Sequence, residues 1–244
     1  MKLLLDAGNT RIKWALVQDD TWVAEGAVEH AAVHTLAEVL AAHPPLNAAL
    51  GVNVAGEALG RDLQACVAAR GIPLQWLHSS ASLCGVTNLY EDPTQLGTDR
   101  WAALIGARAA HPGPCLVVSA GTATTVDLLD AHGHFEGGLI LPGEQLMRQS
   151  LARDTARLPL ADGEPRDPPR NTVDAIVTGC LYAQAGAIER MFARIAPIPD
   201  ALCLLAGGNA NRIAPLLAMP VRRIDNLVLR GLAVVAANTS LPAG

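Results

Sequence analysis

The feature that most constrains this chain is an order of short apolar segments that occurs twice, each time around a glycine-containing turn. The first copy places three apolar segments within residues 3–28, with a turn at Gly8. The second copy places three such segments within residues 115–141, with a turn at Gly121. Each copy predicts an antiparallel strand meander, although any two meanders look alike. Two similar halves favour a duplicated α/β fold.

The remaining apolar patterns extend each copy with alternating helices and strands. A boundary near Pro112-Gly113-Pro114 predicts two domains, residues 1–113 and 114–244, with mixed sheets flanked by helices and an interdomain cleft. Both turns could then face one ligand. A loop is expected at 153–170, which holds four prolines. Helices are expected at 35–42, 57–69, 144–152, 173–195, 209–218 and 229–238, and further strands at 48–54, 73–77, 201–205 and 221–224.

Composition excludes several classes of protein. The 244 residues are 50% hydrophobic and only 17% charged, with a net charge of -5 and no basic run, which argues against nucleic-acid or membrane-surface binding. The N-terminal apolar run is too short for a signal peptide, and no 18-residue apolar stretch occurs, so we expect a cytoplasmic protein. Five cysteines without CxxC spacing predict buried thiols: Cys66, Cys84, Cys115, Cys180 and Cys203.

The first turn, Asp6-Ala7-Gly8-Asn9-Thr10, follows a carboxylate at a strand end with a glycine that lets backbone N–H groups approach an anion. Such a turn can hold a phosphate while Asp6 orients Mg²⁺, directly or through water, and Lys13 could reach the same phosphate. An ordinary hairpin with a turn-forming asparagine is the alternative interpretation.

The second turn, within 119–125, is rich in hydroxyls and carries no charge. Together the two turns favour binding of nucleotide phosphates over two unrelated hairpins. Gly207-Gly208 follows a buried strand and opens a helix, a place where a backbone can approach a nucleoside, but a plain strand-to-helix turn explains it equally well. GxGxxG and GxxxxGK[ST] are both absent, which argues against a dinucleotide fold and a P-loop.

Two further patterns could carry chemistry. Leu96-Gly97-Thr98-Asp99-Arg100 heads a predicted helix, where the helix dipole alone would explain an aspartate. The same environment would keep Asp99 ionised and able to accept a proton from a hydroxyl, and Arg100 offers a planar fork for a carboxylate. His132-Gly133-His134 has the look of a metal pair, but its setting favours a solvated hairpin turn.

Taken in order, these segments resemble the type III pantothenate kinases of the sugar kinase/heat-shock protein/actin superfamily. The resemblance spans residues 3 to about 235 and implies duplicated actin-like (ribonuclease H-like) domains. The Gly-Thr-Asp-Arg element, combined with both turns, is its most specific part. The matching residues are Asp6 to Lys13, Tyr90 before Pro93, Leu96 to Arg100, Gly121 to Thr125, Asn171 to Ile176, and Gly207-Gly208.

The resemblance implies transfer of the γ-phosphoryl group of ATP to the hydroxyl of pantothenate, the first step towards coenzyme A. It implies that Asp99 is the proton acceptor and that Arg100 and the backbone of Gly97 and Thr98 hold pantothenate, with Tyr90 and Thr172 completing its pocket. It also implies a homodimer and ATP-binding positions at Asp6, Ala7, Gly8, Asn9, Thr10, Arg11, Ile12, Lys13 and Thr122.

One position departs from the family pattern. Ser119 stands where the family usually has an aspartate that helps to bind a monovalent cation such as K⁺. Because a neutral hydroxyl is a weaker ligand than a carboxylate, we expect no strong activation by K⁺ or NH₄⁺. Two other functions stay open: a kinase of another small hydroxy acid or sugar, and an ATP-binding regulatory or transcription accessory protein of the same fold.

Overall fold

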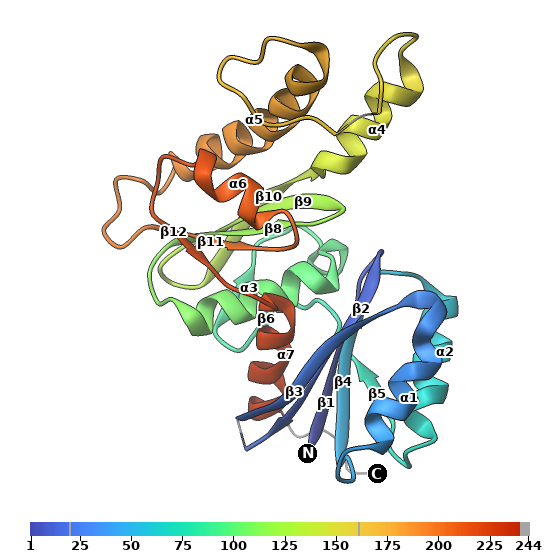
Figure 1. The fold of residues 1–244 in the computed structure, drawn as a ribbon. Helices are drawn as coiled ribbons and strands as arrows, with labels where there is room; N and C mark the ends of the chain where they lie inside the picture. The colour runs from blue at the N-terminus through green and yellow to red at the C-terminus, as the bar shows by residue number, and fades with distance from the viewer. Residues whose placement is uncertain (20, 161, 240–244) are drawn as a thin grey trace. The chain divides into compact units, whose positions relative to one another are not determined.

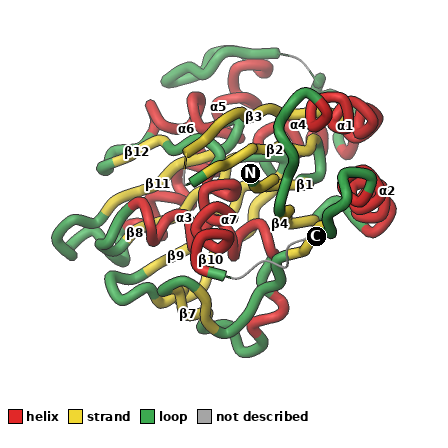
Figure 2. The backbone as a smooth tube through the Cα atoms, turned by 90° about the horizontal axis from the view of Figure 1, so that it is seen from below, coloured by secondary structure: helices red, strands yellow, loops and turns green. Residues whose placement is uncertain are grey.

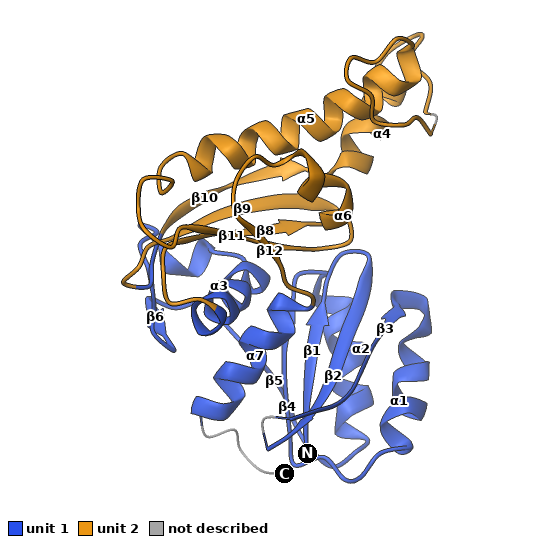
Figure 3. Cartoon of the chain, turned by 60° about the vertical axis from the view of Figure 1, so that its left-hand side comes forward, with its two compact units in different colours: residues 1–110, 133–135, 226–244 blue, residues 111–132, 136–225 orange. Residues whose placement is uncertain are grey.

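The structure is a computed structural model that describes residues 1–19, 21–160 and 162–239. It divides into two compact units, which are described separately (Figures 1 and 3). The first unit comprises residues 1–110, 133–135 and the chain from 226 onward. The second comprises residues 111–132 and 136–225.

The first unit is built on a five-stranded mixed sheet with the strand order β3-β2-β1-β4-β5. β1 pairs antiparallel with β2 and parallel with β4, and its residues Leu3, Leu4 and Leu5 are fully buried. A strand covered on both faces reads as a continuous apolar run, which explains this segment. The strands are β1 (Lys2–Ala7), β2 (Arg11–Gln18), β3 (Thr21–Glu29), β4 (Ala48–Asn53) and β5 (Leu74–Trp76).

Helices cover both faces of this sheet. α1 and α2 pack on one face, and α3 and α7 pack together on the other (Figures 1 and 2). α3 and α7 cross closely at Gly106 and Gly231, since a Cβ at Gly231 would overlap the carbonyl oxygen of Ala102. The bounds are η1 (His30–Ala32), α1 (Val33–Ala41), α2 (Glu57–Ala68), α3 (Thr98–Ala110) and α7 (Leu227–Asn238).

A short hairpin completes the first unit ahead of α3. β6 (Ser82–Leu83) pairs antiparallel with β7 (Val86–Asn88), and β7 pairs in parallel with His134 and Phe135. A 3-10 turn, η2 (Pro93–Gln95), then leads into α3. The sequence patterns did not predict this hairpin, because two- and three-residue strands carry too little periodicity.

The second unit repeats the strand order of the first unit as β12-β11-β8-β9-β10, five strands of a seven-stranded sheet that β7 and β6 extend beyond β10. β8 pairs antiparallel with β9 and parallel with β11, and α5 packs on β8 and β9. The elements are β8 (Cys115–Ala120), β9 (Ala123–Leu129), β10 (His134–Pro142), α4 (Glu144–Asp154), α5 (Thr172–Phe192), β11 (Leu202–Ala206), α6 (Ala210–Ile213), η3 (Ala214–Leu216) and β12 (Val221–Arg223).

The two sheets confirm the predicted duplicated α/β fold. The strands can be counted in chain order, from β1 in the first copy and from β8 in the second. Each strand of one copy then occupies the same place in its sheet as the strand of the same number in the other copy. The turns differ in length: four residues separate the paired Ala7 and Ile12, whereas three separate Ala120 and Thr124. The first turn therefore contains one more residue than the second.

The grouping of the C-terminal helix differs from the domains expected at 1–113 and 114–244. α7 belongs to the first unit because it packs on α3, a contact between segments far apart in sequence. The helix expected over 209–218 is also shorter, since α6 ends at Ile213 and a 3-10 turn follows at Pro215. Proline lacks the N–H that a continuing α-helix needs.

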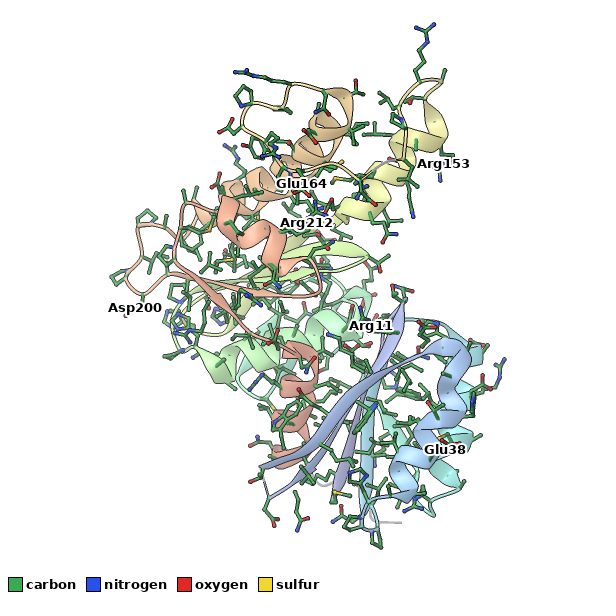
Figure 4. The ribbon with its side chains drawn as sticks, viewed as in Figure 1. Arg11, Glu38, Arg153, Glu164, Asp200 and Arg212 are labelled. Carbon is green, nitrogen blue, oxygen red and sulfur yellow. The ribbon has the colours of Figure 1, made fainter. Side chains whose placement is uncertain are left out.

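The proline-rich segment between α4 and α5 is a loop, as predicted, and it is tied to both helices. Arg148 of α4 contacts Asp162 at 2.8 Å. The N–H of Glu164 donates to Asp174, and the N–H of Arg166 donates to Thr178, both on α5. Figure 4 shows Arg153 and Glu164 at this end of the second unit.

The structure also describes the His132–His134 turn, the lengths of the helices and the state of the cysteines. His132 and His134 flank the β9–β10 turn, and the described residues contain no group of three or more His, Cys, Asp or Glu suited to a metal. None of the described helices has the length and apolarity needed to cross a membrane. All five cysteines are free; Cys115, Cys180 and Cys203 are buried as expected, whereas Cys66 and Cys84 are half-buried.

Candidate functional site

Asp6 lies near the end of β1, the central strand of the first unit, where two other charged residues affect its ionisation. Its cross-strand neighbour on β2 is Lys13. Burial raises the pKa of Asp6 from 3.8 to about 6; the charge of Lys13 lowers this pKa, and the charge of Asp99 raises it. The charge of Asp99, which belongs to the Leu96–Arg100 motif, thus acts on Asp6 of the first turn motif.

The carboxylate of Asp6 could hold a cation at this place. The charge of Asp99 raises the pKa of Asp6, so a divalent cation would stabilise ionised Asp6. Mg²⁺ is commonly held by one or two carboxylates together with substrate phosphates rather than by a complete protein cage. The oxygen donors of this site thus fit Mg²⁺.

The first turn combines buried anchors with an exposed tip. Ala7 and Ile12 are fully buried and fix the strand ends, so they can serve a ligand through their backbone only. Asn9, Thr10 and Arg11 are exposed, and Figure 4 shows Arg11 at the start of β2. This arrangement suits the predicted phosphate turn, because its polar groups are at the surface and its ends are held rigidly.

Two neighbouring segments hold this turn in place. The N–H of Val54, just after β4, donates to the carbonyl of Ala7 at 3.0 Å. The ring Nε2 of His30, the first residue after β3, lies 2.8 Å from the carbonyl oxygen of Gly8. The residues that follow β3 and β4 therefore form hydrogen bonds with the turn between β1 and β2 and with the residue just before it.

Asp99 is the second residue of α3, and its carboxylate folds back over the preceding glycine. Its Oδ1 accepts a hydrogen bond from the N–H of Arg100 at 2.8 Å. A Cβ at Gly97 would come within 2.8 Å of the same oxygen, so a side chain there would require the Asp99 carboxylate to shift. The helix N-terminus stabilises an aspartate here, as the sequence indicated. The capping role and a role as proton acceptor are therefore compatible.

Arg100 is buried against a pair of aromatic rings that contact each other. It is only 6% exposed, and its guanidinium carbon lies 5.8 Å from the ring centre of Tyr90 and 5.7 Å from that of Phe135. Its Nη1 donates to the Tyr90 hydroxyl at 3.2 Å, and the two rings are 5.0 Å apart. These contacts restrain the guanidinium, which favours oriented binding of a carboxylate.

The loop that carries Tyr90 is shaped by buried polar groups. The side chain of Asn88 accepts from the N–H of Tyr90 at 3.1 Å and donates to the carbonyl of Pro93 at 3.1 Å. Asp92 is the N-cap of the 3-10 turn Pro93–Gln95 before Gly97, and it accepts from the N–H and the hydroxyl of Thr94. Tyr90 and the Gly97–Arg100 segment are thus parts of one hydrogen-bonded structure.

In the second unit the corresponding turn is uncharged. Ser119 pairs with Thr125 across the strands, at the places that Asp6 and Lys13 occupy in the first copy. Thr122 is exposed at the turn, whereas Thr124 is fully buried and donates to Gln184 at 2.7 Å. This turn offers backbone groups and a hydroxyl rather than charges.

The Gly207-Gly208 segment lies beside this second turn. The N–H of Asn209 donates to the carbonyl of Ala120 at 3.1 Å. Arg212 on α6, labelled in Figure 4, contacts the buried Glu144 at 3.0 Å. The glycine pair and the hydroxyl-rich turn are therefore neighbours in the second unit, although they are more than 80 residues apart in the sequence.

Thr172 is the exposed first residue of α5. Its neighbour Asn171 is the N-cap of that helix and accepts from the N–H of Asp174 at 2.9 Å. Thr172 and Thr122 both belong to the second unit, whereas Tyr90 and Gly97 to Arg100 belong to the first. The structure thus distributes the predicted residues over both units.

A cavity of about 420 Å³ in the first unit reaches the start of α3. Of the residues predicted for the acceptor pocket, Thr98 lines it, and its other walls come from α2 and the segment around β5. The lining residues are Asn53, Glu57, Gly60, Arg61, Gln64, Trp76, Leu77, His78 and Thr98.

The family model of the type III pantothenate kinases matches residues 2–194. This chain belongs to the type III pantothenate kinase family. It is 58% identical over 236 residues to the type III pantothenate kinase of Aromatoleum aromaticum, covering 97% of this chain and 98% of that protein. It is 50% identical over 232 residues to the type III pantothenate kinase of Dechloromonas aromatica, covering 95% and 97%.

Solved structures show the same fold for this pantothenate kinase family member. A candidate Baf family transcriptional activator from Campylobacter jejuni matches with a TM-score of 0.60 at 20% identity, covering 97% of this chain and 98% of that one. A candidate 2-dehydro-3-deoxygalactonokinase from Sinorhizobium meliloti matches with a TM-score of 0.61 at 16% identity, covering 97% of each. At these identities the likeness concerns the fold alone.

Sequence reasoning about this family member missed several residues of the site. Phe135 opens the third strand of the second copy, yet it belongs to the first unit and packs against Tyr90 and Arg100. His30 and Asn88 contact the turn and the Tyr90 loop through side chains. Phe135 is one of only two phenylalanines in the chain, which is the sole signal that could have drawn attention to it.

Proposed function

We propose that this chain transfers the γ-phosphoryl group of ATP to the hydroxyl of pantothenate, giving 4'-phosphopantothenate and ADP at the first step towards coenzyme A. Membership of the type III pantothenate kinase family supports this activity. The observation that carries the chemistry is the pairing of Asp6 with Lys13 across neighbouring strands, together with the charge of Asp99, which raises the pKa of Asp6.

Asp99 is the proton acceptor of the proposed reaction. The pantothenate hydroxyl oxygen forms a bond to the γ-phosphorus while the bond from that phosphorus to the β–γ bridging oxygen breaks. ADP leaves with that electron pair, and the hydroxyl proton passes to Asp99 late in the transfer. Because the transition state of phosphoryl transfer is loose, the enzyme mainly positions the reactants and neutralises charge. A strong base is therefore not required.

ATP binding is assigned to the first turn and its flanking residues. The backbone of Gly8 to Thr10 faces the phosphates, Lys13 adds a positive charge, and Thr122 of the second unit adds a hydroxyl. Asp6 holds Mg²⁺ directly or through water. When bound, Mg²⁺ neutralises the phosphate oxygens and supplies electrostatic stabilisation as charge develops.

Arg100 binds the carboxylate of pantothenate. Its burial against the rings of Tyr90 and Phe135 supports this role, since a partly dehydrated guanidinium forms strong charge-assisted hydrogen bonds. The backbone of Gly97 and Thr98 contributes polar groups beside it, and Thr172 completes the pocket. This set would select an acceptor that carries both a hydroxyl and a carboxylate.

The wider setting follows from the family. We infer a cytoplasmic homodimer that acts on small molecules rather than on nucleic acid or membranes, consistent with the net charge of -5. Ser119, standing where the family usually has an aspartate, supports activity that needs no monovalent cation.

One coupled assay tests the proposed function. ADP release is measured with purified protein and MgATP, with and without pantothenate, and then with a panel of other hydroxy acids and sugars. We expect release that depends on pantothenate and is much weaker with the panel. Faster release with a panel member would assign a different acceptor. ATP binding without acceptor-dependent release would favour the regulatory alternative.

A further inference from the structure

The loop between the first and second strands receives a hydrogen bond from the residue that follows the third strand, in both copies. In the first copy this residue is His30, directly after β3, and its Nε2 lies 2.8 Å from the carbonyl oxygen of Gly8. In the second copy it is Gly143, directly after β10, and its backbone N–H donates to the carbonyl of Thr122 at 2.8 Å. The two contacts are equivalent in the fold.

The two copies make this contact with different groups. At Gly143 the backbones approach so closely that a Cβ would overlap the carbonyl oxygen of Gly121. The first turn contains one more residue than the second. There the contact comes from a side chain, and the imidazole of His30 bridges to Gly8.

The chemistry of the His30 contact has a single direction. A carbonyl oxygen can only accept a hydrogen bond. Nε2 of His30 must therefore be the protonated ring nitrogen, and it donates a hydrogen bond to the carbonyl of Gly8. Gly8 belongs to a turn with an exposed tip, and glycine loses more conformational freedom on ordering than any other residue. A donor fixed at the end of β3 therefore restricts the turn before any ligand arrives.

We propose that His30 is a positioning residue for ATP, which holds the Gly8 turn in its phosphate-binding conformation. This inference rests on the proposed assignment of that turn to ATP. His30 does not touch the reacting atoms; its hydrogen bond lowers the conformational cost of binding the triphosphate. Its loss should therefore weaken binding of MgATP and leave binding of pantothenate unchanged.

The test compares direct MgATP binding and steady-state kinetics for four variants. His30→Ala removes the ring, His30→Phe keeps a ring without a donor, and His30→Gln restores an N–H donor. His43→Ala is the matched control, because the His43 ring also bonds a backbone carbonyl at 2.8 Å, that of Val39 at the end of α1.

For His30→Ala and His30→Phe we expect the Kd and the KM for MgATP to rise about 3- to 10-fold, the loss typical of one hydrogen bond. The KM for pantothenate should stay at the wild-type value, and His30→Gln should recover most of the MgATP affinity. His43→Ala should lower the melting temperature at most, without changing either KM. His30→Phe keeps the test valid if His30→Ala does not fold.

Two outcomes would overturn the proposal. One is an unchanged MgATP affinity in both donor-free variants. The other is an equal rise of both KM values that follows the melting temperature. Calorimetric binding of MgATP without pantothenate separates this inference from the proposed reaction, since a His30-dependent Kd in a protein that does not phosphorylate pantothenate would refute the reaction alone. Absence of MgATP binding by wild-type protein would refute both.

Discussion

The two glycine turns have the same place in two similar sheets but different chemistry. Around the first turn, Asp6 and Lys13 face each other across neighbouring strands, and Asp99 lies close by. Around the second, the equivalent pair is Ser119 and Thr125. The duplication has thus kept the backbone scaffold, whereas the charged groups that can neutralise phosphate and accept a proton are gathered in the first unit.

Among the variants that test this difference between the two units, Asp99→Asn should have the largest effect. If the first unit carries the acid–base chemistry, this change should lower kcat by about 10²- to 10⁴-fold while leaving the fold intact, because general-base assistance is commonly worth that much. Steady-state kinetics with circular dichroism measures both. Asp92→Asn, in the preceding loop, is the control and should keep kcat near wild type. Normal turnover of folded Asp99→Asn would remove this residue from the mechanism.

Arg100→Ala tests whether the same unit also recognises the acceptor. Loss of a charged hydrogen-bonding partner costs about 1.5–3 kcal/mol, so the KM for pantothenate should rise about 10- to 150-fold with a smaller change in kcat. Tyr90→Phe keeps the ring and removes only the hydroxyl that accepts from Arg100, so its effect should be smaller. An unchanged KM for pantothenate in Arg100→Ala would give Arg100 a purely structural role.

Asp6→Asn should make the metal-free protein more stable at neutral and alkaline pH. The folded pKa of about 6 lies above the ordinary 3.8, so ionised Asp6 destabilises the fold. The destabilisation caused by ionised Asp6 is absent below pH 3.8, the ordinary pKa that applies to the unfolded chain. It grows as the pH rises from 3.8 to about 6, the pKa in the folded protein, and is complete above about pH 6. In EDTA at pH 8 the melting temperature should rise by about 6–12 °C, and the gain should roughly halve at pH 5.

Ser119→Asn is the matched control at the equivalent position of the second copy. Because Ser119 carries no charge, its substitution should give no comparable pH-dependent difference in melting temperature. A gain for Asp6→Asn that is the same at pH 5 and pH 8 would show that ionisation of Asp6 is not its cause.

The smallest expected effect concerns monovalent cations. Wild-type activity in sodium or Tris buffer should equal that in potassium, because the second turn lacks the carboxylate that would bind K⁺. Ser119→Asp should introduce stimulation by K⁺. These rates are compared at constant ionic strength, and a several-fold dependence of the wild-type enzyme on K⁺ would contradict the prediction.

The sequence predicted the parts of the molecule that depend on local patterns. The meander at 3–28 follows from apolar segments and turn residues, and Leu3, Leu4 and Leu5 of β1 form a continuous apolar run because both faces of the strand are covered. The charged turn and the Asp99 helix were recognisable because each is one continuous stretch. Their proximity was implied only by the family resemblance, and the structure supports it through the coupling of Asp6 to Lys13 and Asp99.

The contacts that the sequence did not predict join distant segments through single residues. Phe135 reaches Arg100 because β10 begins beside β7. His30, which follows β3, contacts Gly8 in the turn between β1 and β2. No periodic pattern in the sequence predicts such a contact for a single histidine after a strand. The return of α7 to the first unit depends on its close crossing with α3, which no local property of residues 227–238 reveals.

That crossing has a consequence for how the protein is made. α3 carries Asp99 and Arg100, and its partner α7 is translated more than 110 residues later. At about 5–20 residues per second, the nascent chain waits on the order of ten seconds for this partner to leave the ribosome. Until then the apolar surface of α3 that α7 will cover has no permanent neighbour, so the helix bearing Asp99 is among the last parts of the fold to be secured.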